Sequence, residues 1–178
     1  MKTLFFGLLL ISTTPISAKS LPKDKNLGIA VNPFYLFVVT PSGKGEQYLS
    51  ATISHFNHNK KVEIAMPLHR MRLGSFQQKT LDLHYRKYLR SSISGPYISG
   101  FTRFAKLERN SESEFKVGFG AGVGFKLFHS SGAYWGASLN GGIYPKASQK
   151  FTTSDLFVIT DNNRFIFDVE LFKFGYAF

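Results

Sequence analysis

The stretch that decides the fold is Glu114–Phe128, which reads EFKVGFGAGVGFKLF. Its odd-numbered positions carry an apolar side chain from Phe115 to Leu127, whereas its even-numbered positions are glycines between Lys116 and Lys126. A β-strand places alternate residues on opposite faces, and a helix would mix the two sets around its circumference. The stretch therefore predicts a strand with one bulky apolar face and one face of very small side chains.

The same period of two recurs along the chain. Segments that show it are Leu27–Val31, Leu49–Ser54, Val62–His69, Leu81–Arg86, Pro96–Leu107, Tyr134–Tyr144 and Arg164–Phe178. Together with the first stretch they predict about eight strands of roughly ten residues or more, the length that a tilted membrane-crossing strand needs. We therefore expect an all-β fold: a closed, antiparallel, up-and-down transmembrane β-barrel.

The glycine-rich face distinguishes this barrel from an ordinary sheet. Glycines occupy alternate positions from Gly118 to Gly124 and occur again at Gly136 and Gly142. A surface in water gains nothing from glycine, whereas the interior of an eight-stranded barrel only just holds side chains. We expect apolar residues to face lipid, and small or charged residues to line the lumen. Two other interpretations stay open: bends in an ordinary sheet, and a water-soluble barrel with its apolar face inside.

The chain begins like an exported precursor. Lys2 is followed by the apolar run Leu4–Ile11, which is too short to span a bilayer, and then by the small residue Ala18. We predict a signal peptide over residues 1–18, cleaved after its last residue, and one barrel domain over residues 19–178. The chain contains no cysteine, so its stability must come from packing or from a closed hydrogen-bond network.

The chain is strongly basic, with a net charge of +11 from 22 lysines and arginines against 11 acidic residues. An exported chain meets little nucleic acid, so we expect no such partner. The phosphate-rich surface that it would meet is lipopolysaccharide or anionic lipid. Cations that the pattern places near the outer membrane edge are Lys44, Arg70, Arg72, Lys146 and Lys150. These are the predicted lipopolysaccharide contacts, with simple solvation of the loops as the alternative.

The connections between strands divide into two kinds. Short, turn-like segments occur at Asn57–Lys60, Arg90–Gly95 and His129–Gly132. Between them lie Thr40–Gly45, Arg70–Gly74, Leu107–Ser113 and the long Pro145–Asn163. With both chain ends on one side of the membrane, the three short turns fall on that side and the longest loop on the other, as in outer-membrane barrels.

The last strand carries a separate signal. Phe172, Phe174, Tyr176 and Phe178 alternate up to a final aromatic residue. This ending resembles the signal that the barrel-assembly machinery reads in outer-membrane proteins. The length and strand rhythm of the chain resemble the small eight-stranded barrels of the OmpA/OmpX/OmpW-type group. The resemblance implies the outer membrane of a Gram-negative bacterium as location, and the assembly machinery as partner during biogenesis.

Two places depart from strict alternation. If Phe172–Phe178 faces lipid, Asp168 and Glu170 share that parity and would also face outward, unless a β-bulge resets the register. Arg103 likewise shares its parity with the aromatic Phe101. The sequence leaves both cases open.

No catalytic group, cofactor site or metal site is predicted. The glycines from Gly118 to Gly124 lack the spacing of a dinucleotide-binding loop. The five histidines are scattered over different segments without metal-ligand spacing. His129 and Ser131 resemble the His-x-Ser pattern of lipid A deacylases, but the following segment has no carboxylate to orient the histidine, and the tract lies in a predicted turn.

A group of charged residues is predicted inside the barrel. Its members are Asp82, His84, Arg86, Lys116 and Lys126, with Glu63 as a further candidate. Buried charges need partners, so we expect a network across the lumen. Such a network would act as a structural plug or as a narrow ion path, and eight strands favour the plug.

These observations favour a non-enzymatic, monomeric outer-membrane barrel. Its role would be structural, lipopolysaccharide-contacting or one of surface interaction, and it would need no cofactor. A lipid A-modifying outer-membrane hydrolase and a soluble periplasmic ligand-binding barrel are the alternatives.

Overall fold

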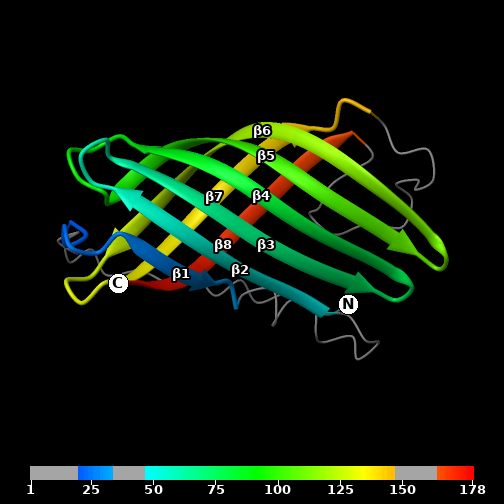
Figure 1. The fold of residues 1–178 in the computed structure, drawn as a ribbon, viewed down its shortest axis with the longest axis horizontal. Helices are drawn as coiled ribbons and strands as arrows, with labels where there is room; N and C mark the ends of the chain where they lie inside the picture. The colour runs from blue at the N-terminus through cyan, green and yellow to red at the C-terminus, as the bar shows by residue number, and fades with distance from the viewer. Residues whose placement is uncertain (1–19, 34–46, 147–163) are drawn as a thin grey trace, which may run out of the picture.

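The computed structural model describes residues 20–33, 47–146 and 164–178. Eight strands, each hydrogen-bonded to its neighbours in chain order, close into a barrel (Figure 1). They are β1 Leu27–Val31, β2 Gln47–Asn57, β3 Val62–Leu73, β4 Phe76–Tyr88, β5 Gly95–Arg109, β6 Glu112–Phe128, β7 Ala133–Ile143 and β8 Phe165–Ala177. Within the described ranges there is no helix long and apolar enough to cross a membrane. The predicted all-β, closed, antiparallel up-and-down barrel is confirmed, while the predicted signal peptide lies outside the described residues.

The barrel closes between its first and last strands. β1 has five residues, fewer than the ten or so that we predicted, and pairs with β8 over four residue pairs. Two backbone hydrogen bonds extend this seam: Leu27 N–H donates to Phe178 O at 3.1 Å, and Phe178 N–H donates to Leu27 O at 2.9 Å. Each strand therefore has a hydrogen-bonded neighbour on both sides, although β1 covers only residues 174–177 of β8.

Large apolar side chains cover the outside of the barrel. On β6, Phe115 is 65 % and Phe119 52 % exposed, whereas Lys116 and Lys126 on the opposite face are buried. Exposed apolar residues of the other strands include Ile29, Leu49, Ile53, Ile64, Leu68, Leu81, Leu83, Ile98, Leu139 and Phe167. The predicted orientation, with bulky residues outward and small or charged residues inward, is therefore confirmed.

The inner glycines allow strands and rings to approach closely. A Cβ atom on Gly120 would lie 2.2 Å from the carbonyl oxygen of Gly141. A Cβ atom on Gly124 would lie 2.2 Å from the ring of Tyr97, which reaches across that position. Any larger residue would therefore collide with backbone or with a buried ring, which explains why this face of β6 is glycine.

A β-bulge on β8 resolves the first departure from alternation. The register shifts on β7 between Gly136 and Ser138, and Leu171 and Phe172 of β8 together fill the space opposite. Both of these side chains are exposed, and Phe172 takes a left-handed backbone with a φ of 60°. This conformation is uncommon for a bulky residue, so the bulge is held by the pairing around it.

The bulge changes which residues of β8 face the interior. Asp168 and Glu170 are buried, and so is Lys173. In a regular strand Glu170 and Lys173, three positions apart, would face opposite sides of the sheet. The extra residue brings both inward while Phe174 and Tyr176 stay exposed.

The second departure from alternation, at Arg103, involves no bulge: on β5 the aromatic residues of the same parity face inward with it. Tyr97, Phe101 and Arg103 are all buried, with 4 %, 5 % and 4 % exposure, and face the interior together. Ile98 and Phe104 are exposed on the outer face. The aromatic residues of β5 therefore line the lumen, and Arg103 needs no bulge to do the same.

The end of the barrel where β1 begins and β8 ends carries the three short turns. The predicted segments Asn57–Lys60, Arg90–Gly95 and His129–Gly132 lie there, next to the start of β1 and the end of β8 (Figure 1). The short turns are therefore on the predicted side.

The opposite end differs from the prediction. Connections do occur at the predicted segments Arg70–Gly74 and Leu107–Ser113, but they are shorter than predicted, because strand pairing continues through most of these polar residues. Two-residue turns at Gly74–Ser75 and Asn110–Ser111 join the strands instead, and the first residue of each takes a positive φ, 57° and 55°, as tight hairpins require. Thr40–Gly45 lies outside the described residues.

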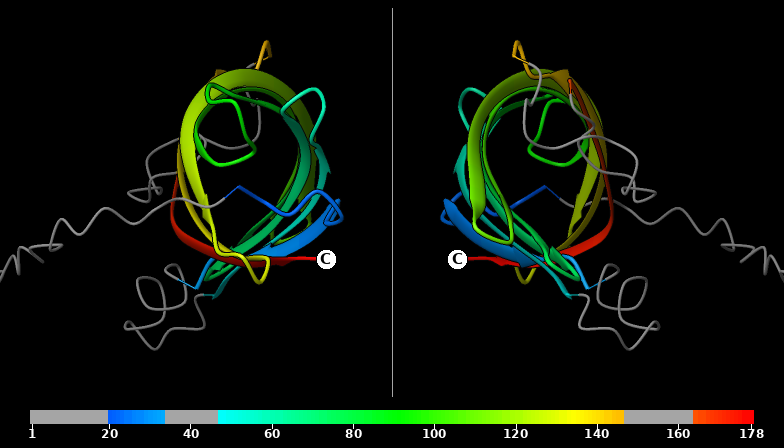
Figure 2. Two further views of the ribbon diagram at one scale, coloured as in Figure 1. Left: turned by 90° about the vertical axis from the view of Figure 1, so that its left-hand side faces the viewer. Right: turned by 90° about the vertical axis from the view of Figure 1, so that its right-hand side faces the viewer.

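Apolar side chains close the end of the barrel where β1 begins and β8 ends. Leu21, which precedes β1, and Ile93, from the β4–β5 turn, are each 2 % exposed and belong to one cluster. The other members of this cluster are Ala30, Phe56, Tyr88, Tyr97, Phe128, Tyr134 and Ala177. In the end-on view, the blue segment before β1 crosses the mouth of the ring (Figure 2). We call this cluster the apolar plug.

The glycine contacts predict a difference between two alanine variants. Gly120→Ala should lower the free energy of unfolding by about 1–3 kcal/mol, because the added carbon meets backbone that cannot move aside. Gly141→Ala is the matched control, since a Cβ atom there meets nothing within 4 Å, and it should unfold at or above the wild-type urea concentration. Urea titration of the protein folded in detergent micelles measures both. Equal midpoints would contradict the packing described.

Candidate functional site

The interior of the barrel holds a dense set of charges. Four carboxylates and five lysine or arginine side chains are buried there. The carboxylates are Glu63, Asp82, Asp168 and Glu170, and the cations are Arg86, Arg103, Lys116, Lys126 and Lys173. They come from strands β3, β4, β5, β6 and β8, so their interactions join strands on different sides of the ring.

Glu63 on β3 is the centre of the first cluster. Its carboxylate accepts hydrogen bonds from Arg86 Nη1 at 2.9 Å, Lys126 Nζ at 2.7 Å and Ser54 Oγ at 2.7 Å. The hydroxyl of Tyr88 donates to its second oxygen at 2.7 Å. Arg86 and Glu63 are direct cross-strand partners, whereas Lys126 reaches Glu63 from β6, across the lumen. Such charge-assisted bonds on both oxygens satisfy a carboxylate that water cannot reach.

Glu170 extends this cluster to β8. Its carboxylate pairs with Lys173 and accepts a hydrogen bond from Ser138 Oγ at 3.1 Å. Arg86 Nη2 lies 3.9 Å from Glu170 Oε2, so Arg86 stands between two carboxylates. The cluster therefore crosses the barrel from β3 to β8.

Arg103 on β5 is the centre of the second cluster. Its Nε and Nη2 atoms donate to both oxygens of Asp82, at 2.8 Å and 2.6 Å. Nη2 also donates to Asp168 Oδ2 at 3.2 Å. Nearby, His84 stacks on the ring of Phe101, with centroids 4.9 Å apart. One guanidinium therefore joins β4, β5 and β8.

All five residues of the predicted interior network lie on the inner face, but not in one network. Arg86 and Lys126 belong to the Glu63 cluster, and Asp82 belongs to the Arg103 cluster. The Nε2 atom of His84 lies 3.6 Å from Asp82 Oδ2. The Nζ atom of Lys116 lies 4.1 Å from the centre of the Tyr144 ring.

Sequence reasoning left the orientation of Arg103, Asp168 and Glu170 open and missed Lys173. Arg103 was hidden because aromatic residues share its face of β5. Asp168, Glu170 and Lys173 were hidden because the bulge changes the parity of β8. The signal that could have found them is charge balance: a buried arginine or lysine requires a carboxylate, and few acidic residues were left to supply one.

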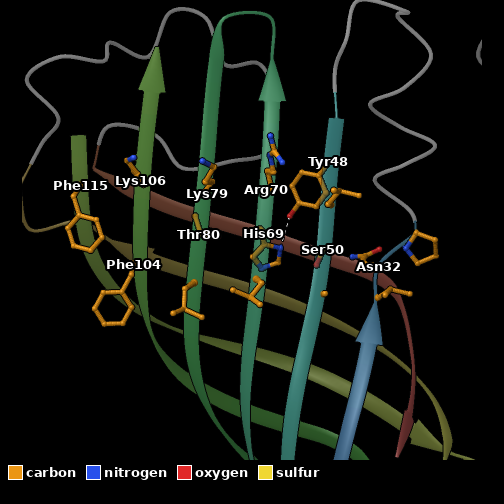
Figure 3. A pocket seen from close by; sticks show the side chains of 16 residues that line it. Asn32, Tyr48, Ser50, His69, Arg70, Lys79, Thr80, Phe104, Lys106 and Phe115 are labelled. Carbon is orange, nitrogen blue, oxygen red and sulfur yellow. Dashed lines mark hydrogen bonds between the residues drawn. The ribbon is translucent and has the colours of Figure 1, made fainter. Parts of the chain in front are cut away.

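One group of side chains has the donor types of a metal site. Ligand atoms of His69, Asp82 and Asp168 lie within 4.8 Å of one another, and all three residues are buried. Arg103, however, already contacts both carboxylates and supplies the positive charge that a metal ion would bring. His69 Nδ1 is in turn hydrogen-bonded to the Tyr48 hydroxyl at 2.9 Å (Figure 3). The geometry favours an ion-paired cluster over a metal centre.

His129 and Ser131, the pair that resembles a hydrolase motif, lie in an exposed turn. Ser131 Oγ is 3.0 Å from His129 Nδ1, and the same oxygen accepts the backbone N–H of Ala133 at 3.3 Å. Among the hydrogen bonds of the described residues, none joins His129 to a carboxylate. The contacts are those of a turn that satisfies its own backbone.

The remaining predicted residues lie on the outer surface. Phe172, Phe174, Tyr176 and Phe178 are all exposed, and Arg70 and Arg72 lie on the outer face of β3. Lys146 is exposed beyond β7, whereas Lys44 and Lys150 lie outside the described residues.

Comparisons of the chain with protein-family models, curated proteins and solved structures gave no match in any of the three. The functional argument therefore rests on the geometry.

The Glu63 cluster predicts a large effect from one lost charge. Glu63→Gln should destabilise the barrel by about 3–5 kcal/mol, because Arg86 and Lys126 would keep buried charges without their shared partner. Glu108→Gln is the matched control: Glu108 also pairs with two cations, Lys79 and Lys106, but at the surface, and should change the urea midpoint little. A Glu63→Gln protein as stable as the control would show that the cluster does not hold the strands together.

Proposed function

We propose that the chain is an outer-membrane β-barrel protein of a Gram-negative bacterium, with a non-enzymatic role in the cell envelope. One observation carries the proposal: apolar side chains cover the outside of the closed barrel, and ion pairs fill its inside. Water favours the reverse arrangement, because exposed apolar surface and buried charge both cost free energy there. A bilayer favours the arrangement observed.

The height of the apolar surface supports a bilayer. On β4, the outward side chains Leu81, Leu83 and Tyr85 are bounded by Lys79 toward one end and Lys87 toward the other. Eight residue steps of about 3.3 Å, along a strand tilted by about 40°, span about 20 Å. The aliphatic stems of the two lysines extend this band at both edges, so its height approaches the value of about 25 Å that is typical of membrane barrels.

The C-terminal strand supports delivery to the outer membrane. The bulge keeps Phe174 and Tyr176 outward up to the final Phe178, so the aromatic row that resembles the assembly signal is accessible. We propose residues 1–18 as the export signal, the barrel-assembly machinery as the partner during biogenesis, and a monomer of the OmpA/OmpX/OmpW-type group as the mature form.

The interior argues for a structural role rather than for transport or catalysis. A ligand carrier of the soluble kind keeps an apolar cavity inside its barrel. Here the apolar plug closes one end, and two ion-paired clusters cross the lumen beyond it. Each of the four buried carboxylates is engaged by a cation, which leaves none of them placed as a free general base.

Membrane insertion predicts two results for the wild-type protein. Expressed from its full-length gene in a Gram-negative host, the protein should fractionate with the outer membrane. Unboiled samples should also migrate differently from boiled ones in a denaturing gel, because a closed barrel resists cold detergent. Recovery in the soluble periplasm, with one migration in both conditions, would favour the ligand carrier instead.

An arginine introduced on the outer surface should affect the stability of a membrane barrel and of a soluble barrel differently. Leu83→Arg places a cation at the middle of the apolar band and should destabilise a membrane barrel by about 2–4 kcal/mol. Leu89→Arg, on an exposed leucine beyond Lys87, is the control and should have little effect. Urea unfolding in lipid vesicles measures both. In a soluble barrel both substitutions would be harmless, since both side chains already face solvent.

The filled interior predicts low ion conduction. Purified protein added to a planar bilayer should produce no long-lived current steps, because the apolar plug and the paired clusters occupy the lumen. Discrete and stable steps from the wild-type protein would indicate an open path and would contradict a plug.

A further inference from the structure

Three cations form a row on the outside of the barrel, toward the end opposite the start of β1. Arg70 on β3 is the direct partner of Lys79 on β4, and Lys79 is the direct partner of Lys106 on β5. Figure 3 shows the three side chains next to one another on adjacent strands. Like charges directly opposite each other in a sheet repel. The row is therefore unfavourable unless an anion lies against it.

The protein supplies only part of the negative charge that this row requires. Glu108 pairs with Lys79 at 3.2 Å and with Lys106 at 2.7 Å. Arg70, and Arg72 in the next outward position of β3, are exposed, and none of the ion pairs among the described residues includes them. Among the described residues, Arg70, Lys79 and Lys106 thus share the single carboxylate of Glu108, while Arg72 lines a hollow together with Glu108 and Glu112.

The surface next to the row is apolar. Directly below Arg70, Lys79 and Lys106 the outward side chains of the same three strands are Leu68, Leu81 and Phe104. They belong to the lining of an apolar hollow of about 1110 Å³ on the outer face, with Leu49 and Phe115 at its sides (Figure 3). A free anion would contact only the cations, whereas a lipid with an anionic headgroup would contact both the cations and the apolar surface.

We propose that Arg70, Lys79 and Lys106 bind the phosphates of a lipid of the outer leaflet, the phosphorylated lipid A part of lipopolysaccharide. The inference rests on the proposed function, since it requires the band below the row to lie in a membrane. Strands about 4.8 Å apart spread the three cations over about 10 Å, which suits a headgroup with more than one phosphate. The acyl chains then lie along Leu68, Leu81 and Phe104.

This site revises the contacts expected from sequence. Arg70 stays in it, and Lys79 and Lys106 join it because strand register brings them beside Arg70, whereas Arg72 lies one outward position further along β3. Lys146, beyond the end of β7, lies on another strand pair and is not part of the row.

The test compares two triple variants of the full chain, extracted from outer membranes in mild detergent. The first is Arg70→Gln, Lys79→Gln and Lys106→Gln. The control is Lys23→Gln, Lys60→Gln and Lys87→Gln, which removes the same number of exposed cations from the other end of the barrel. The probes are purified lipopolysaccharide, the same material after phosphatase treatment, and inorganic phosphate.

We expect the control to bind lipopolysaccharide like the wild type. At about fivefold per cation near an anionic surface, the first variant should bind about a hundredfold more weakly. Phosphatase treatment should weaken binding to the wild type to a similar degree, and inorganic phosphate should not compete. Equal binding by the two triple variants would overturn the site, as would undiminished binding of the dephosphorylated lipid. Competition by inorganic phosphate would identify a simple anion site and would overturn the lipid assignment.

Two further readouts keep the outcome decisive. Arg70→Gln alone disturbs none of the ion pairs of the described residues and should weaken binding about fivefold, so the site stays testable if the triple variant folds poorly. Gel migration with and without boiling is recorded for every protein. If the wild type is not a membrane barrel, the proposed function fails; if all variants are membrane barrels and bind alike, only this inference fails.

Discussion

The structure depends on the narrowness of an eight-stranded barrel, whose interior holds side chains and little else. This constraint decides the composition of both faces. Where a ring or the backbone of the neighbouring strand lies close against the inner face, the facing residue must be glycine, as at Gly124 and Gly120. Where charged side chains point inward, each must find a partner within the width of the barrel, because water cannot accompany it. The outward positions, free of this constraint, carry the large apolar residues.

The bulge on β8 links the two faces. Without its extra residue, Glu170 and Lys173 could not both point inward, and Arg86 would lose its second carboxylate. The same residue keeps the terminal aromatic row pointing outward. One local irregularity therefore serves the packing of the interior and the presentation of the C-terminal strand, and Phe172 adopts an unfavourable backbone conformation to provide it.

The two ends of the barrel are chemically different. The end where β1 begins and β8 ends is closed by Leu21, Ile93 and a layer of aromatic rings. Toward the other end the strands extend into two-residue turns, and their outer faces carry Arg70, Lys79 and Lys106. We propose that this polarity corresponds to the two sides of the outer membrane, with the cationic end facing the lipid phosphates.

The amino-acid sequence by itself determined the fold class and which side chains face outward in β1, β2, β3, β4, β6 and β7, because the period of two is a local property of a strand. It also determined that Asp82, Arg86 and Lys126 point inward. Only the tertiary structure decided the partners of those charges, the place of the bulge, and the alignment of Arg70 with Lys79 and Lys106. These features depend on strand register, which is set by hydrogen bonds between segments far apart in the chain and leaves no periodic trace in any one of them.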